Sequence, residues 1–132
     1  MSPPEAFIIP NSESNGQYLR GCKAAGIKGH PARFPAKLPE FFIRFLTEPG
    51  DLVLDIFGGS CTTGQVAEAE ERRWITCDLE AEYVAAGAFR FLPREFAEEK
   101  AREIYQSIVT GKKVDFRKEY RARQENLFEV AL

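Results

Sequence analysis

Asp51-Leu52-Val53-Leu54-Asp55-Ile56-Phe57-Gly58-Gly59-Ser60-Cys61-Thr62-Thr63-Gly64 is the stretch that decides the fold. An apolar run ends in an acid, and a loop of small residues and a pair of threonines that open a helical pattern follow it. This order is typical of a parallel strand that leads into a helix, with backbone N–H groups at the carboxyl end of the strand. Nucleotide-like ligands bind at that place in α/β sheets, so we expect a ligand site here.

Helices and strands alternate after this stretch. We expect a strand over 52–57 that is buried on both faces, and a helix from Thr62 or Thr63 to about residue 73. A second strand over 74–77 ends at Asp78, and helices follow over 80–91 and roughly 94–110. A strand–helix–strand connection of this length predicts parallel strands joined by a right-handed crossover. The expected fold class is α/β, as half of a nucleotide-binding fold.

The segment before the first strand is punctuated by glycine and proline. We expect a short helix that ends near Ala25, an irregular segment over 28–37, and a helix from Leu38 that stops at Pro49-Gly50. One apolar face of this last helix follows the helical period, through Leu38, Phe41, Phe42, Phe45 and Leu46.

Composition limits the classes of protein and of site. The 132 residues carry a formal charge of −2, which argues against a protein that grips nucleic acid over its whole surface. Cys22, Cys61, Cys77 and the single His30 have no metal-ligand spacing, so no metal site is expected. Widely spaced cysteines, no signal peptide and no membrane-spanning run favour a cytoplasmic protein without a membrane partner.

The loop of residues 58–64, called the glycine loop below, does not have the glycine spacing of a dehydrogenase or of a P-loop. Asp55 would repel a pyrophosphate but would favour a sulfonium or ammonium group. Asp78 follows the next strand, where an acid can accept hydrogen bonds from ribose hydroxyls. S-adenosyl-L-methionine suits this set of groups, and the alternative is a tight turn without a ligand.

Two segments carry a resemblance to a known family. Residues 55–63 resemble the cofactor motif of amino-methyltransferases that act on DNA, and His30-Pro31-Ala32-Arg33-Phe34-Pro35-Ala36-Lys37-Leu38-Pro39 resembles the segment before it in the permuted, beta-type class. Residues 74–78 and 82–91 are similar too. The likeness is greatest to cytosine-N4 enzymes of restriction–modification systems. It implies a partial Rossmann-like methyltransferase fold that depends on S-adenosylmethionine, with parallel strands and flanking helices.

The resemblance also implies which residues bind the cofactor. The methionine end of the cofactor would be lined by Asp55, Phe57 and Gly59, with Ser60 and Thr62 as hydrogen-bonding partners. At the nucleoside end, Asp78 would hold the ribose and Leu79 would pack on the adenine. The residues that would close over the cofactor are His30, Phe34 and Pro35.

The sequence departs from the family pattern at two positions in this loop. Ile56 replaces a common proline, which should matter little because isoleucine is a good strand residue. Cys61 replaces glycine or asparagine, so a left-handed backbone there would be strained. We interpret Cys61 as a packed, inert thiol rather than as a nucleophile.

The catalytic motif of these enzymes is missing. It is a tetrapeptide of Ser, Asp or Asn, two prolines and an aromatic residue that stacks on the flipped base. Ser2-Pro3-Pro4 is followed by Glu5, and we interpret it as a coincidental loop, so no catalytic residue is assigned. The basic residues of the tail could contact DNA phosphates or form a solvated, frayed helix; they are Lys112, Lys113, Arg117, Lys118, Arg121 and Arg123.

Together these features predict the C-terminal, cofactor-binding part of a cytosine-N4 DNA methyltransferase. We expect an N-terminal segment over 1–29, a cofactor-binding half-domain over 30–110 and a charged tail over 111–132. The expected partners are DNA and a separate polypeptide that carries the catalytic and target-recognition parts. The alternatives are a non-catalytic remnant or binding module that keeps the fold, and an unrelated small-molecule enzyme with Asp55 as catalytic acid.

Overall fold

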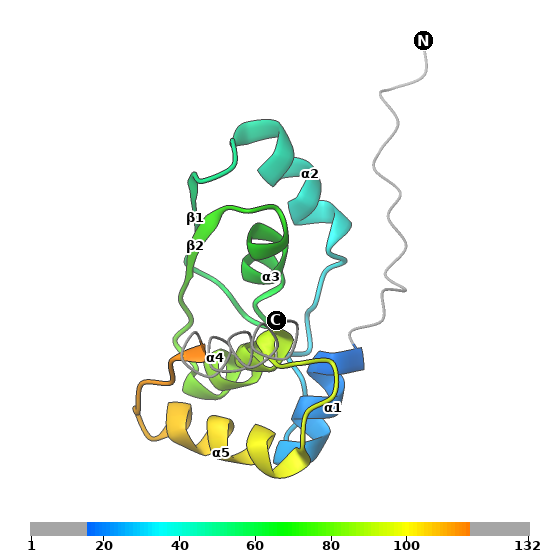
Figure 1. The fold of residues 1–132 in the computed structure, drawn as a ribbon, viewed down its shortest axis with the longest axis vertical. Helices are drawn as coiled ribbons and strands as arrows, with labels where there is room; N and C mark the ends of the chain where they lie inside the picture. The colour runs from blue at the N-terminus through cyan, green and yellow to red at the C-terminus, as the bar shows by residue number, and fades with distance from the viewer. Residues whose placement is uncertain (1–15, 117–132) are drawn as a thin grey trace, which may run out of the picture.

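Two parallel strands and the helices beside them make up residues 16–116, the part of the chain that the computed structural model describes (Figure 1). The elements in order are α1 (Gly16–Ala25), α2 (Lys37–Leu46), β1 (Leu52–Asp55), α3 (Thr62–Ala69), β2 (Arg73–Thr76), α4 (Ala81–Gly87), the 3-10 helix η1 (Ala88–Phe91) and α5 (Glu98–Val109). The predicted order of helices and strands and the α/β class are confirmed. The predicted domain boundaries after residues 29 and 110 stay predictions.

β1 and β2 form a parallel pair that α3 connects. The register runs from Leu52 beside Arg73 to Asp55 beside Thr76. β1 ends two residues earlier than expected, because the Asp55 carboxylate turns back to accept a hydrogen bond from the Phe57 N–H at 2.9 Å. An aspartate that bonds the backbone two residues on makes a turn, and this turn begins the glycine loop.

Within the described residues 16–116, only one face of this sheet is covered by packed side chains. Ile43 of α2 and Val66 and Ala67 of α3 form a small core with Val53 and Trp74. Leu54 and Ile75, which neighbour each other in the register, lie on the opposite face with 61% and 50% of their surface exposed. The prediction that the first strand is buried on both faces is therefore wrong. A parallel strand that is buried on both faces has a continuous apolar sequence. Within residues 16–116, no layer packs on the second face of β1.

The apolar face of α2 is also largely uncovered. The helix buries Pro39 and Ile43. Phe41 stacks on Phe45 with ring centroids 5.9 Å apart, yet Phe45 keeps 74% of its surface exposed. The predicted amphipathic helix is confirmed, but much of its apolar stripe stays exposed within residues 16–116, with Leu46 at 68% beside Phe45 at 74%.

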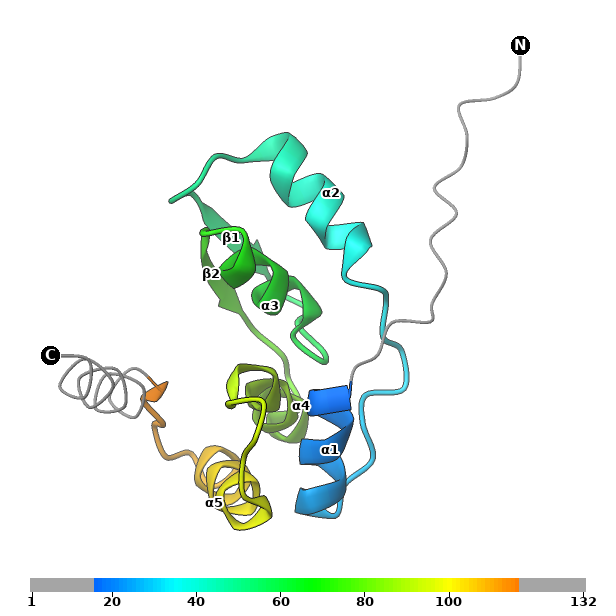
Figure 2. The same ribbon diagram turned by 45° about the vertical axis from the view of Figure 1, so that its right-hand side comes forward.

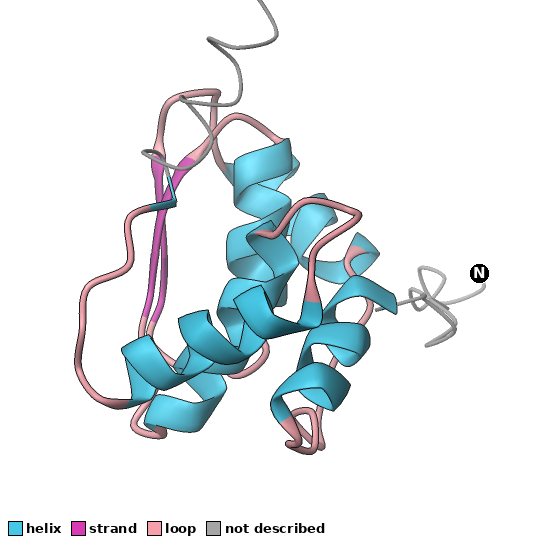
Figure 3. Cartoon of the chain, turned by 60° about the horizontal axis from the view of Figure 1, so that its bottom comes forward, coloured by secondary structure: helices cyan, strands magenta, loops and turns pink. Residues whose placement is uncertain are grey.

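A second core lies below the sheet, where α1, α4 and α5 pack together (Figures 2 and 3). Its buried members include Tyr18, Phe89, Ala101 and Ile104. Gly21 allows the Phe89 ring to lie against α1, because a Cβ at residue 21 would be 2.4 Å from the ring.

The last helix begins later than the sequence pattern predicts. α5 starts at Glu98 rather than near Arg94. The intervening Phe96 packs against the second core, and the Arg94 carbonyl accepts a hydrogen bond from Arg20. These contacts draw residues 94–97 out of a helical path.

Among residues 16–116, no helix is both long enough and apolar enough to cross a membrane.

Candidate cofactor site

The glycine loop crosses the carboxyl ends of both strands. The Gly58 N–H donates to the Cys77 carbonyl at 2.8 Å, so the loop is fastened to the segment after β2. A Cβ at Gly58 would lie 3.0 Å from the Thr76 Cβ, which leaves little room for a larger residue. The loop therefore lies at the edge of the sheet where ligands generally bind in α/β folds.

Asp78 is fixed beside this loop by backbone hydrogen bonds. Its carboxylate accepts the Glu80 N–H at 3.0 Å on one oxygen and the Gly59 N–H at 2.9 Å on the other. These bonds, with that from Glu80 the larger, lower the pKa of Asp78 and keep it ionised at neutral pH. Each oxygen retains a further lone pair, so the carboxylate can still accept ligand hydroxyls.

His30 also lies against the loop. Gly59 has φ of +51°, and a Cβ there would lie 3.3 Å from the His30 Nε2. The His30 ring meets Tyr83 of α4 edge-on, with centroids 4.4 Å apart. The structure thus brings His30, Gly59 and Asp78 together from three separate segments of the chain.

The remaining predicted apolar residues stay near the surface. Phe57 is 83% exposed and Leu79 is fully exposed, while Phe34 is exposed and Pro35 half-buried between His30 and α2. The roles of these residues and of Asp55 toward a cofactor stay predictions.

Ser60 and Thr62 are turned into the protein. Both are buried, and their hydroxyl oxygens lie 3.1 Å apart. Each also accepts a hydrogen bond from the Arg90 Nη2 of η1, at 3.1 Å. Sequence reasoning did not select Arg90, although a single arginine within the small and apolar run of residues 84–92 was an available signal.

Cys61 adopts the left-handed conformation that the sequence analysis identified as strained. Its φ and ψ are 62° and 30°, directly before α3. The thiol lies 3.5 Å from the Thr76 hydroxyl, and burial raises its pKa. A raised pKa disfavours the reactive thiolate, as expected of an inert thiol.

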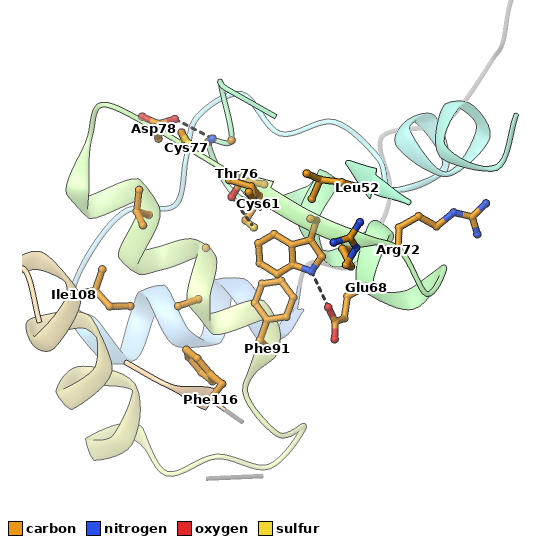
Figure 4. A pocket seen from close by; sticks show the side chains of 18 of the residues that line it. Leu52, Cys61, Glu68, Arg72, Thr76, Cys77, Asp78, Phe91, Ile108 and Phe116 are labelled. Atoms are coloured by element: carbon orange, nitrogen blue, oxygen red, sulfur yellow. Dashed lines mark hydrogen bonds between the residues drawn. The ribbon is translucent and has the colours of Figure 1, made fainter. Parts of the chain in front are cut away.

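A groove of about 1290 Å³ runs from the glycine loop along β2 (Figure 4). Gly58, Gly59 and Asp78 line one end of it. Trp74 stacks on Phe91 within it at 4.9 Å, and the indole N–H donates to Glu68 at 2.7 Å. The glycine loop and Asp78 therefore border an open groove.

Two predicted sequence features lie outside the described residues: Ser2-Pro3-Pro4, and the tail from Arg117 to Arg123. Within residues 16–116, no group of three metal-ligating side chains occurs.

A family model described as DNA methylase matches residues 5–89. The type II methyltransferase M.PvuII of Proteus hauseri is 65% identical over 113 residues, which are 86% of this chain and 34% of that protein. The type II methyltransferase M.BglI of Bacillus subtilis is 35% identical over 64% of this chain and 25% of its own length. The DNA adenine methyltransferase YhdJ of Escherichia coli (strain K12) is 41% identical over 48% of this chain and 21% of its own.

A solved structure has the same fold. The cytosine-N4-specific PvuII DNA methyltransferase superposes with a TM-score of 0.81 and 65% sequence identity, over 86% of this chain and 40% of that one. The chain thus spans about a third or less of the length of these curated relatives.

Proposed function

Because the chain belongs to the DNA methylase family, we propose that it is the cofactor-binding part of a cytosine-N4 DNA methyltransferase. The observation that most supports this function is the meeting of His30, Gly59 and Asp78 at the carboxyl ends of two parallel strands. The high identity to a cytosine-N4-specific enzyme favours N4 of cytosine over N6 of adenine.

S-adenosyl-L-methionine is the cofactor that the site fits best. Asp78 would hold the ribose hydroxyls, because its oxygens keep free lone pairs after binding the Glu80 and Gly59 N–H groups. Because Gly59 has no side chain, His30 can lie close to the loop backbone, and the two would flank the bound cofactor.

The other predicted residues complete this assignment. Asp55, Phe57 and Gly59 would line the methionine end, and Leu79 would offer its exposed side chain to the adenine. Phe34 and Pro35 would close over the cofactor with His30. Bound S-adenosyl-L-methionine supplies an electrophilic methyl group on a positive sulfonium.

The buried hydroxyls of Ser60 and Thr62 face Arg90. They would act by shaping the loop, whose backbone N–H groups at the start of α3 suit the cofactor carboxylate.

DNA and a further polypeptide are the proposed partners. The family's catalytic tetrapeptide would come from that polypeptide, together with the residues that read the DNA. The open face of the sheet, with Leu54 and Ile75 exposed, supports a partner that packs there. Such a partner would supply the part of the fold that lies outside the 40% of the solved relative matched by this chain.

Calorimetric titration with S-adenosylmethionine tests the cofactor assignment. We expect saturable binding to the full chain, and no comparable binding of NAD, because the loop lacks the dinucleotide spacing. Absence of binding at millimolar S-adenosylmethionine would favour the alternative of a decayed remnant.

Reconstitution tests the assignment of a partner. The chain is mixed with a polypeptide that carries the Ser-Pro-Pro-aromatic motif, and methyl transfer to DNA is measured. Leu54→Lys and Ile75→Lys should abolish transfer, because they place charges in the proposed interface, whereas Glu99→Lys on the exposed side of α5 should not. Binding of cofactor without transfer in any mixture would favour a non-catalytic binding module.

A further inference from the structure

Tyr18 of α1 and Arg90 of η1 are two buried side chains outside the predicted cofactor site. They lie between the two parts of that site, which are the His30 segment and the glycine loop. Tyr18 is 1% exposed and Arg90 is 7% exposed. The Arg90 guanidinium carbon lies 4.7 Å from the centroid of the Tyr18 ring, which is the geometry of a cation–π contact. Burying a guanidinium costs desolvation energy, so its hydrogen bonds indicate what it stabilises.

Within residues 16–116, Arg90 donates hydrogen bonds to the glycine loop and to the first turn of α3. The Nε donates to the Ser60 carbonyl, and one Nη donates to the hydroxyls of Ser60 and Thr62 at 3.1 Å each. The other Nη donates to the Gln65 side-chain carbonyl at 2.8 Å. The planar fork of an arginine can make all these bonds at once, which a lysine cannot do. Arg90 thus holds the buried side of the loop in one shape.

Tyr18 makes the corresponding contact with the His30 segment. Its hydroxyl accepts the His30 N–H at 2.9 Å. A Cβ at Gly29 would lie 3.1 Å from the Tyr18 ring, so the segment passes close against the ring. Arg33, whose guanidinium lies 5.8 Å from the same ring, donates to the His30 carbonyl at 2.8 Å. The backbone of His30 is therefore held on both sides.

We propose that Tyr18 and Arg90 are positioning residues that set the spacing between His30 and the glycine loop, and so preorganise the cofactor site. This inference rests on the proposed function. The order of contacts is His30, Tyr18, Arg90, and then Ser60 and Thr62. Neither positioning residue belongs to the cofactor-binding residues named above, and neither needs to touch the ligand.

Conservative variants of the full chain test this role. Arg90→Lys keeps the charge but loses the fork, and Tyr18→Phe keeps the ring but loses the acceptor for the His30 N–H. Arg72→Lys is the matched control, because Arg72 is also buried and makes its hydrogen bonds at the other end of the sheet, to Thr47 and Glu70. Two quantities are measured: the affinity for S-adenosylmethionine by calorimetry, and amide hydrogen exchange of residues 28–31 and 58–64.

We expect Arg90→Lys to lower the affinity roughly tenfold, the loss of one or two charge-assisted hydrogen bonds, and to accelerate exchange in the loop. Tyr18→Phe should accelerate exchange around His30 and lower the affinity several-fold. Arg72→Lys should leave both readouts within twofold of wild type, even where it lowers the melting temperature.

Unchanged affinity and exchange in a folded Arg90→Lys variant would overturn the inference, and so would equal losses in Arg72→Lys. If the wild-type chain binds no S-adenosylmethionine, the proposed function fails separately. Exchange then still decides the positioning role, which is supported only if the loop opens faster in Arg90→Lys than in Arg72→Lys. Where Arg90→Lys does not fold, Tyr18→Phe and the Ser60→Ala/Thr62→Val variant carry the same test.

Discussion

The Asp78 carboxylate accepts the backbone N–H of Gly59 at 2.9 Å and so joins the loop after β1 to the end of β2. Its second oxygen accepts the Glu80 N–H just before α4. The Asp78 side chain therefore fixes both the glycine loop and the turn before α4, and it lies where a ribose would bind. An effect of Asp78 on ligand binding has both a direct part and a part that acts through Gly59.

Replacing Asp78 tests its role in cofactor binding. Asp78→Asn should weaken S-adenosylmethionine binding at least tenfold, because the amide can accept from only one N–H and places its NH2 against the other. Asp51→Asn is the matched control. Its carboxylate likewise accepts a backbone N–H, that of Glu48 at 2.9 Å, but at the opposite end of β1. Calorimetry that found equal affinities for the two variants would contradict the ribose assignment.

The free energy of unfolding should depend on pH in the way that the lowered pKa of Asp78 predicts. Backbone N–H groups, above all that of Glu80, lower its pKa below the ordinary value of 3.8, so the folded state binds the proton less tightly than the unfolded state does. The stabilising contribution is complete above pH 3.8 and is lost as the pH falls through the lower, folded value. The difference in free energy of unfolding between wild type and Asp78→Asn should be constant above about pH 5 and should shrink below pH 3.8. A difference that grew on acidification would have the wrong sign.

Gly64 is expected to resist substitution although it lies inside a helix. A Cβ there would lie 2.7 Å from the Cys61 Sγ and 2.9 Å from the Trp74 Cε3. Overpacking of this kind costs about 1–3 kcal/mol, against a gain of about 1 kcal/mol in helix propensity. Gly64→Ala should therefore lower the free energy of unfolding in urea. Because Cys61→Ala removes one of the two clashing atoms, the double variant should lose less stability than the sum of the single variants.

Much of the fold could be predicted from local patterns. The first strand, the glycine loop and the acid at residue 78 each have a local physical cause, and the structure places them in the expected order, although the strand ends at Asp55 rather than at residue 57. The sequence indicates only that a left-handed backbone at Cys61 would be strained, and the structure shows that conformation there. Short-range rules suffice for these features, because the turns and helix starts are made by residues near one another in sequence.

Long-range packing is what the patterns could not supply. The apolar run of β1 indicated two covered faces, but the periodicity does not say whether the covering layer belongs to the same stretch of chain. Ser60 and Thr62 have the polarity of ligand-binding residues, yet Arg90, about 30 residues away, takes up both hydroxyls. A buried arginine partner has no periodic signature, so its contacts appear only in three dimensions.

The two sides of α2 should respond differently to substitution. Ile43→Ala removes a buried side chain that packs with Val66 and Ala67, and should lower the free energy of unfolding by about 2–4 kcal/mol. Phe45→Gln should change it by less than about 0.5 kcal/mol, since 74% of that side chain is already exposed. Urea unfolding of both variants checks this, and a large loss in Phe45→Gln would show that the stripe is covered in solution.

Cysteine labelling should distinguish the three thiols. Cys77 is exposed, whereas Cys22 and Cys61 are buried, and burial raises the pKa of both. Iodoacetamide near neutral pH should therefore modify Cys77 first in the folded chain and all three cysteines in urea, as followed by mass spectrometry. In Cys77→Ser the folded protein should react only slowly. Rapid modification of Cys61 in that variant would contradict an inert thiol, because it would require a thiolate that the buried position beside Thr76 disfavours.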